Sequence, residues 1–265
     1  MLRDAPRGPA QKRAGGGVLL RALRWALRGL LLLFGMSVLQ VILLRWIDPL
    51  FTLTMVEASL QAHTRTDRWS VPQRRRLPAG ATEAAVARMI VSSEDGRFFL
   101  HHGFEWRAIC AAVQHNRRPG AKLRGASTIS QQVARNVFLW QRRSMARKLA
   151  EAYYTVLLEL LVPKQRILEV YLQVAQTGPV GFGVEWGAQH HFQKSALELN
   201  EDEAARLASL LPAPARRGVR GPEADRRAAR VRAHRAPLPT DPGFEALRTA
   251  DAGRPPAWRA CLRGG

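Results

Sequence analysis

The pattern of apolar and polar positions begins with one long uncharged run near the N-terminus. Residues 29–44 read GLLLLFGMSVLQVILL and contain no ionisable side chain. A helix of this length extends about 24 Å, close to the thickness of the hydrocarbon core of a membrane. Two arginines and two tryptophans flank the run at positions typical of membrane interfaces: Trp25, Arg28, Arg45 and Trp46. The pattern predicts one transmembrane anchor over residues 29–45.

The segment before this run is strongly basic. Residues 1–28 contain seven arginines and lysines and a single acid, Asp4. Because such cations are enriched on the cytoplasmic side, we expect residues 1–28 in the cytoplasm and the rest of the chain across the membrane. The alternative is a cleaved signal peptide. The run is long for one, and the RWIDPLF that follows offers no small-residue cleavage site, so a retained anchor is favoured.

Helical patterns dominate the chain beyond a connector over residues 46–77. Apolar residues recur at spacings of three and four from Thr82 onward, and no segment alternates as a strand does. Predicted helices end at Ser93, cover Trp106–Val113, and begin near Ser127, Ser144, Pro163 and Asn200, with a short one before the last. The two serines are suited to be N-caps. We therefore expect a mainly α domain over residues 78–214.

The fourth of these helices has an apolar stripe that we expect to face the core. The stripe consists of Leu149, Tyr153, Val156 and Leu160.

The composition changes after residue 214. Residues 215–265 are rich in arginine and proline and poor in large apolar side chains, so we expect a poorly ordered tail with at most a short basic helix near residues 228–234.

The whole chain has a formal charge of +20, which indicates an anionic partner such as nucleic acid, phosphate or a lipid surface. Cys110 and Cys261 lack the spacing of a metal site or a disulfide framework, although one chance bridge stays open in an oxidising compartment.

Glu94 stands at the end of the first amphipathic helix and is followed by aromatic residues. Burial of a carboxylate in such surroundings raises its pKa and makes it a better base near neutral pH. A solvated helix end is the alternative interpretation of the same pattern.

Three further clusters carry polar residues on the predicted helices. Residues 125–132 read GASTISQQ, which suits either an anion cradle at a helix N-terminus or an ordinary N-cap. Glu151 lies three and four positions after Lys148 and Arg147, a spacing that suits a solvated ion pair or, with its dense cations, a pyrophosphate site. The apolar half of residues 164–172 is expected in the core, and Glu169 is a candidate to brace a neighbouring group.

Taken in order, these clusters resemble the motifs of monofunctional biosynthetic peptidoglycan glycosyltransferases, the class shared with the polymerising domain of bifunctional penicillin-binding proteins. The first motif, E-D-x-x-F-x-x-H-x-G, is filled by Glu94, Asp95, Phe98, His101 and Gly103. The second is filled by Gly125, Ser127, Thr128, Ile129, Gln131, Gln132 and Asn136. The third is filled by Arg147, Lys148 and Glu151, and the fourth by Lys164, Ile167, Leu168, Glu169, Tyr171 and Leu172. The resemblance covers about residues 40–235.

The resemblance implies a fold, a reaction and a location. The fold is mainly α and lysozyme-like, with a membrane-embedded lobe beside the anchor. The reaction joins lipid II units into a growing glycan strand with inversion at the anomeric carbon, on the periplasmic side of the bacterial inner membrane. Implied partners are lipid II, the strand, the membrane and other proteins of cell-wall synthesis and division, but not nucleic acid.

The resemblance also implies roles for individual residues. Glu94 is the base that deprotonates the acceptor hydroxyl. Glu151 assists the departing pyrophosphate, directly or through Mg²⁺ or Mn²⁺, and no organic cofactor is implied. The implied substrate-binding residues are Asp95, Phe98, His101, Ser127, Thr128, Gln131, Gln132, Arg135, Asn136, Arg143, Arg147 and Lys148.

The chain departs from the family pattern at several positions away from the two glutamates. Arg135 replaces a lysine, Gln173 replaces an asparagine, Trp186–Gly187 replaces a pair of small residues, and residues 176–179 lack the usual acidic and aromatic side chains. Three rival functions follow: a lysozyme-like lytic enzyme, a catalytically weakened relative, and a basic membrane-tethered nucleic-acid-binding protein. The cation-rich third motif disfavours the first, and the predicted orientation disfavours the last.

Overall fold

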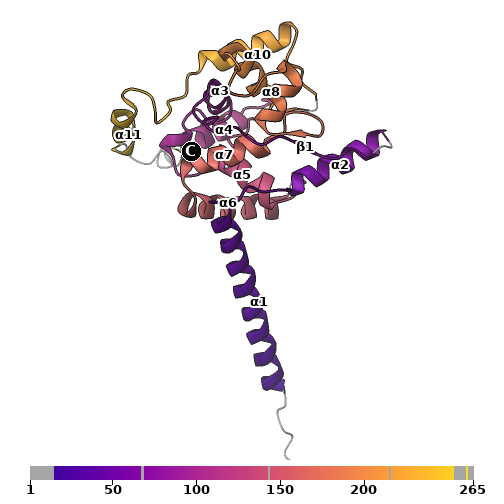
Figure 1. Ribbon diagram of the computed structural model, residues 1–265. Coiled ribbons are helices and arrows are strands. Elements are labelled where there is room, and N and C mark those ends of the chain that lie inside the picture. The colour runs from indigo at the N-terminus through magenta and orange to yellow at the C-terminus, as the bar shows by residue number, and fades with distance from the viewer. Residues whose placement is uncertain (1–14, 67–68, 143, 215, 254–260, 262–265) are drawn as a thin grey trace, which may run out of the picture.

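The computed structural model describes residues 15–66, 69–142, 144–214, 216–253 and 261. Figure 1 shows a long helix, α1, projecting from a helical body. The helices are α1 (Gly15–Leu43), α2 (Leu53–Thr66), α3 (Ala85–Glu94), α4 (Trp106–Asn116), α5 (Ile129–Phe138), α6 (Met145–Leu161), α7 (Lys164–Val174), α8 (Val184–Phe192), α9 (Glu201–Ala208), α10 (Pro222–Ala233) and α11 (Phe244–Ala252), with a 3-10 turn at Phe98–Leu100. In the described residues, strands are limited to β1 (Gln73–Arg74) and β2 (Gly181–Phe182), which pair in parallel. The mainly α fold class is confirmed.

The anchor helix α1 is longer than the predicted anchor over 29–45. Its stretch Leu20–Leu43 has a mean hydropathy of 2.0 and the length to cross a membrane. The helix extends further because arginine is a good helix former, so the end of the uncharged run does not end the helix. Near its C-terminal end the helix is fixed to the body, where Ser37 Oγ lies 2.6 Å from the hydroxyl oxygen of Tyr153 in α6.

The predicted connector over 46–77 contains a helix, α2, which the pattern did not reveal. Thr52 caps it by accepting a hydrogen bond of 3.2 Å from the backbone N–H of Met55. Met55 is buried against Phe182, and the Thr54 hydroxyl donates to the carbonyl of Asn136 in α5. The prediction missed α2 because its buried face is short and mixes small and polar residues.

The core lies where α3, α5, α7 and α9 pack together. α5 lies against α6 and α7, while α3 lies against α9 and α10. The core side chains are fully or almost fully buried, and among them are Ile90, Ile129, Leu168, Tyr171 and Leu207. Each contributes on the order of 1.5–3 kcal/mol through burial. The predicted stripes of α3, α5 and α7 therefore face the core as expected.

Helix α6 contradicts the prediction that its apolar stripe faces inward. Leu149 is 70% and Leu160 74% exposed, whereas Glu151 and Thr155 on the other face are buried. The helix is thus inverted relative to a helix of a soluble protein. It lies at the end of the body where α1 emerges (Figure 1), so its exposed apolar face is beside the anchor.

The glycine-rich turn before α8 is explained by Trp186, one of the departures from the family pattern. Its ring packs over the backbone of Gly178, where an added Cβ would come within 2.7 Å of the ring. The indole N–H donates to Gln73 Oε1 at 3.0 Å, next to the β1–β2 pair. The large ring and the small turn residues therefore match each other.

The expectation of a poorly ordered tail is wrong for the described part of it. α10 packs on α3 and α9 through Ala224, Ala228 and Val231. Asp241 makes two hydrogen bonds of 2.7 Å with Arg88 of α3, and Cys261 forms a disulfide with Cys110 of α4. Composition missed this order because the buried stripe is mostly alanine, which contributes little to an apolar signal, and because the bridge spans 151 positions.

Candidate active site

Glu94 is the last residue of α3 and is partly buried. Its Oε2 accepts a hydrogen bond of 2.8 Å from Gln132 Nε2, while its Oε1 is buried and has no hydrogen-bond partner among the described residues. Burial raises the pKa of the carboxyl above its ordinary value, and Gln132, Arg135 and Arg217 oppose part of that rise. A carboxylate with a raised pKa and one unengaged oxygen is suited to accept a proton.

Gln132 is held in position by Tyr171, a residue for which the sequence indicated no role in the site. The Tyr171 hydroxyl donates to Gln132 Oε1 at 3.3 Å, which leaves the amide N–H₂ group directed at Glu94. Burial and the nearby Glu94 charge raise the pKa of Tyr171 well above its usual value, so the hydroxyl stays protonated as a donor. Only its place in the fourth motif distinguished Tyr171 in the sequence.

Asp95 joins the end of α3 to the start of α5. It is buried and accepts hydrogen bonds from His101 Nε2 at 2.9 Å and from the backbone N–H of Ile129 at 3.0 Å. A carboxylate at a helix N-terminus is favoured by the helix dipole. Phe98 beside it is fully buried. These contacts hold the frame of the site, and direct contact of Asp95, Phe98 and His101 with substrate stays a prediction.

The N-cap of α5 is Thr128, not Ser127 as expected. Thr128 and Gln131 form a reciprocal capping box, and the Thr128 hydroxyl donates to the carbonyl of Gly103 at 2.6 Å. Gly103 has a φ of +81°, and a Cβ there would meet the Thr155 methyl at 2.8 Å, so glycine is required. The shift by one residue leaves the Ser127 hydroxyl free to accept from Lys148 Nζ at 3.4 Å.

Glu151 lies in a cationic cluster on the buried face of α6. It is 1% exposed and accepts a hydrogen bond from Arg147 Nη1 at 2.7 Å and another from Lys148 Nζ. Arg147 is buried, whereas the Lys148 side chain is 44% exposed and reaches toward Ser127. The interpretation as a solvated ion pair is therefore excluded. Two cations share one carboxylate, and the net positive charge borders the N-terminus of α5.

The two glutamates are both linked by hydrogen bonds to the start of α5. Gln132 connects this helix end to Glu94, and Ser127 connects it through Lys148 to Glu151. The dipole of α5 adds positive potential at this helix end. The structure thus brings the first three motifs together around one helix end.

A second ion pair was missed in the sequence. Glu159, two turns beyond Glu151 on the same face of α6, accepts from Lys164 Nζ at 2.7 Å and from the Ser130 hydroxyl. Lys164 Nζ also lies 4.3 Å from the centre of the Phe98 ring. Burial lowers the pKa of Lys164, and the Glu159 charge opposes that effect. The pair connects the fourth motif to the first two. In the sequence, the position of Glu159 on the same helix face as Glu151 was the pattern that could have indicated it.

The remaining residues that the resemblance assigned to substrate binding are Arg135, Asn136 and Arg143. Arg135 is close enough to Glu94 to affect its pKa, and the Arg135 Nε is buried without a partner among the described residues. Asn136 is buried and its side chain accepts a long hydrogen bond of 3.4 Å from Gln141. Arg143 lies outside the described residues. Arg217, from the segment expected to be disordered, is an addition that acts on Glu94.

The expected metal ion finds no ready site among these groups. In the part of the chain that the structure describes, no three His, Cys, Asp or Glu side chains gather as ligands. Both oxygens of Glu151 are engaged by Arg147 and Lys148. Mg²⁺ usually binds one or two carboxylates together with substrate phosphates. Because the residues present do not form such a site by themselves, Mg²⁺ or Mn²⁺ stays an expectation and no reaction step is assigned to it.

Comparison with known proteins agrees with this arrangement. A family model described as Transglycosylase matches residues 62–236. A biosynthetic peptidoglycan transglycosylase of Xanthomonas euvesicatoria pv. vesicatoria (strain 85-10) is 48% identical over 205 residues, which cover 77% of this chain and 82% of the relative. Proteins of the same name from Xylella fastidiosa (strain 9a5c) and Stutzerimonas stutzeri (strain A1501) are each 46% identical, over 73% and 74% of this chain and 79% and 81% of the relative. With its motifs gathered around one helix end and a match over most of its length, the chain belongs to the transglycosylase family.

Proposed function

We propose that this chain is a peptidoglycan glycosyltransferase that polymerises lipid II into glycan strands. The observation that carries the proposal is that two carboxylates in unlike surroundings are both linked to the start of α5. Glu94 is partly buried with one oxygen unengaged, whereas Glu151 lies within a cationic cluster. Glu94 is suited to accept a proton, and the cations around Glu151 are suited to bind a diphosphate.

The proposed reaction follows from this division. Glu94 takes the proton of the acceptor 4-hydroxyl, and the oxygen attacks the anomeric carbon of the donor from the face opposite the leaving group. The bond from that carbon to the lipid pyrophosphate breaks, which inverts the configuration. Arg147 and Lys148 stabilise the negative charge that develops on the departing diphosphate, and such preorganised charge supplies a large share of catalysis.

A lysozyme-like lytic enzyme fits the site less well. Glycosidases use one protonated carboxyl as an acid and commonly a second carboxylate as base or nucleophile. Glu151 cannot act in that way while Arg147 and Lys148 both hold it. A cationic cluster is suited to a diphosphate leaving group, which a finished glycan strand lacks.

The proposed location is the bacterial inner membrane, with a single span and the catalytic domain on the periplasmic side. The basic N-terminal segment supports this orientation. The exposed apolar face of α6, beside α1, suits contact with lipid and would bring the site to a lipid-borne donor. The Cys110–Cys261 disulfide suits an oxidising compartment outside the cytoplasm. Such a location leaves other cell-wall synthesis and division proteins as partners, and not nucleic acid.

One pair of assays tests the proposed function. The purified full-length chain in detergent is incubated with lipid II and, separately, with finished cell wall. We expect glycan polymer and free lipid pyrophosphate from the first and no soluble fragments from the second. Release of soluble muropeptides from the wall without polymer growth from lipid II would instead establish the lytic alternative.

The pH dependence of polymerisation should report the environment of Glu94. The base must be ionised, so activity should fall as pH drops through a pKa that burial holds above the ordinary carboxyl value. The charge of Arg217 lowers that pKa in part, so Arg217→Gln should move the acid side of the profile to higher pH. Arg216→Gln, at an exposed neighbouring position, is the control and should leave the profile unchanged. A shift to lower pH in Arg217→Gln would contradict the assignment.

A further inference from the structure

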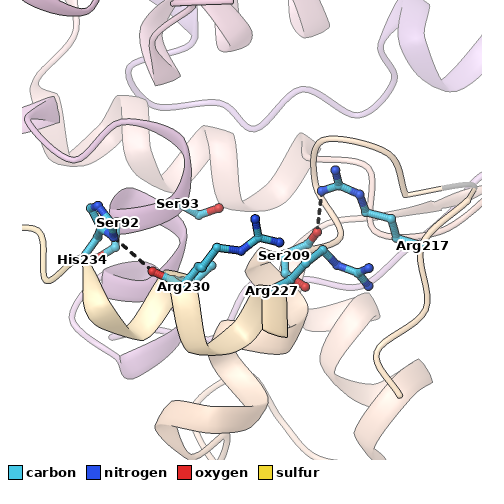
Figure 2. A pocket seen from close by; sticks show the side chains of 8 residues that line it. Ser92, Ser93, Ser209, Arg217, Arg227, Arg230 and His234 are labelled. Carbon is cyan, nitrogen blue, oxygen red and sulfur yellow. Dashed lines mark hydrogen bonds between the residues drawn. The ribbon is translucent and has the colours of Figure 1, made fainter. Parts of the chain in front are cut away.

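A cationic pocket lies beside Glu94, on the side formed by the tail. It has a volume of about 370 Å³ and is lined by the last turn of α3, the end of α9, the segment at Arg217, and α10. Figure 2 shows side chains from these segments around it; those used below are Ser93, Ser209, Arg217, Arg227 and Arg230. The sequence did not indicate this pocket, because two of its walls belong to the segment expected to be disordered.

The charge of the pocket is only partly neutralised by acids, because Arg227 alone of its arginines has an ion-pair partner among the described residues, Glu223. Three arginines line it, and no carboxylate lies among its lining residues. Arg217 donates to the backbone carbonyl of Ser209 at 2.9 Å, and Arg230 to the backbone carbonyl of Arg226 at 3.4 Å. Neither has an ion pair with a described residue. The guanidinium groups therefore retain charge and donors for a bound anion.

Arg227 provides a second, independent indication. Its side chain is 9% exposed, and its Nε is buried without a hydrogen-bond partner among the described residues. Its other nitrogens are engaged, at 2.7 Å with Glu223 and at 2.8 Å with the carbonyl of Gly218. A buried donor left unpaired costs free energy, which an acceptor in the pocket would recover.

The place of the pocket narrows the choice of anion. Ser93 in its wall immediately precedes Glu94, and Arg217 acts on both the pocket and the Glu94 carboxyl. α10 lies at the end of the body opposite α1, whereas the cationic cluster of Glu151 belongs to α6 beside the anchor (Figure 1). A diphosphate tethered to a lipid belongs near α6. A group that reaches α10 must be carried by the sugar and point away from the membrane.

We propose that this pocket binds a carboxylate of the peptide carried by the sugar substrate. The inference rests on the proposed glycosyltransferase function and extends it to the peptide portion of the precursor. Guanidinium groups of Arg217 and Arg230 donate to the carboxylate oxygens, with the Arg227 Nε and the Ser93 hydroxyl as further donors. Binding there would help to position the sugar bearing that peptide against Glu94.

The test compares Arg230→Gln with wild type on two precursors. One is lipid II with free peptide carboxylates, and the other is the same molecule with those carboxylates amidated. We expect Arg230→Gln to raise KM for the free-carboxylate precursor about tenfold with little change in kcat, as for the loss of a charge-assisted hydrogen bond. Amidation should raise the wild-type KM by a similar factor, and the substitution should have no further effect on the amidated precursor.

Arg226→Gln is the matched control, because Arg226 is an exposed arginine of the same helix and contacts the pocket only through its backbone carbonyl. It should leave both KM values unchanged. Equal effects of Arg230→Gln on both precursors, or no effect on either, would overturn the proposal.

A third measurement separates the two sources of an anionic group. Inorganic pyrophosphate is titrated as an inhibitor of wild type and Arg230→Gln. Inhibition that is lost in Arg230→Gln, together with equal KM values for the two precursors, would assign the pocket to phosphate and not to a carboxylate. Absence of polymer from wild type with either precursor would instead refute the proposed function itself, so the two failures are distinguishable.

Discussion

Glu94→Gln is expected to lower kcat for polymerisation of lipid II by about 10²- to 10⁴-fold, the usual contribution of general base catalysis. The amide retains the size of the carboxylate and the hydrogen bond to Gln132, but it cannot take a proton from the acceptor hydroxyl. Because Glu94 has a pKa raised by burial, replacing it by a neutral amide should not destabilise the fold. Initial rates with purified lipid II, together with thermal unfolding, measure both expectations.

Binding of the substrate separates a catalytic role of Glu94 from a structural one. We expect Glu94→Gln to bind lipid II with an affinity close to that of wild type. Glu83→Gln, an exposed carboxylate just before the same helix, should keep full activity. Polymer synthesis at the wild-type rate by Glu94→Gln would refute the assigned role.

Glu151→Gln is expected to lower kcat by about 10²-fold and the free energy of unfolding by about 1–3 kcal/mol. Arg147 and Lys148 each donate to a different oxygen of the carboxylate, and in the amide one of these oxygens becomes an NH₂ group that would face a cation as a donor. Arg147 is buried and would lose its charge partner, while both cations would repel each other more strongly. The cluster would then no longer hold its geometry around the departing diphosphate. Denaturant unfolding and single-turnover rates measure the two effects.

Glu169→Gln offers a control for this effect, because it removes a carboxylate whose own side chain is exposed and whose cation has another partner. Glu169 lies 2.9 Å from Arg166, which keeps a second partner in Asp48 at 2.7 Å. Because Glu169 is exposed and Arg166 keeps Asp48 as its partner, the change in unfolding free energy should stay within about 0.5 kcal/mol and the rate should be unchanged. A stability loss in Glu151→Gln no larger than in this control, with normal turnover, would show that the buried cluster has neither role.

The sequence alone determined the features that depend on residues close to one another in the chain. Helix spacing predicted a mainly α fold and the end of α3 at Glu94, and the uncharged run predicted the anchor. Four motifs in order were specific enough to indicate the family. These features are local because helix periodicity, capping and motif spacing are all properties of neighbouring residues.

Only the tertiary structure decided what each face of a helix contacts. A stripe of apolar residues defines a face but not its surroundings, so the pattern of α6 could not show that Leu149 and Leu160 are exposed and Glu151 buried. Burial in turn decided that Glu151 belongs to a cluster and not to a solvated pair. The contacts of Asp95 also could not be predicted from the local pattern, because its partner Ile129 lies in another helix.

The tail shows the same limit most clearly. Its composition is that of a disordered segment, yet small residues on one face of α10 pack against α3 and α9 and bring Arg217 to Glu94 and Arg227 and Arg230 to a pocket beside it. Alanine contributes little to a hydrophobic pattern, but it permits close packing wherever another surface is available. The chemistry of Glu94 was therefore indicated by its own motif, while the charges around it, those of Arg135 and Arg217, were decided by contacts with other segments of the chain.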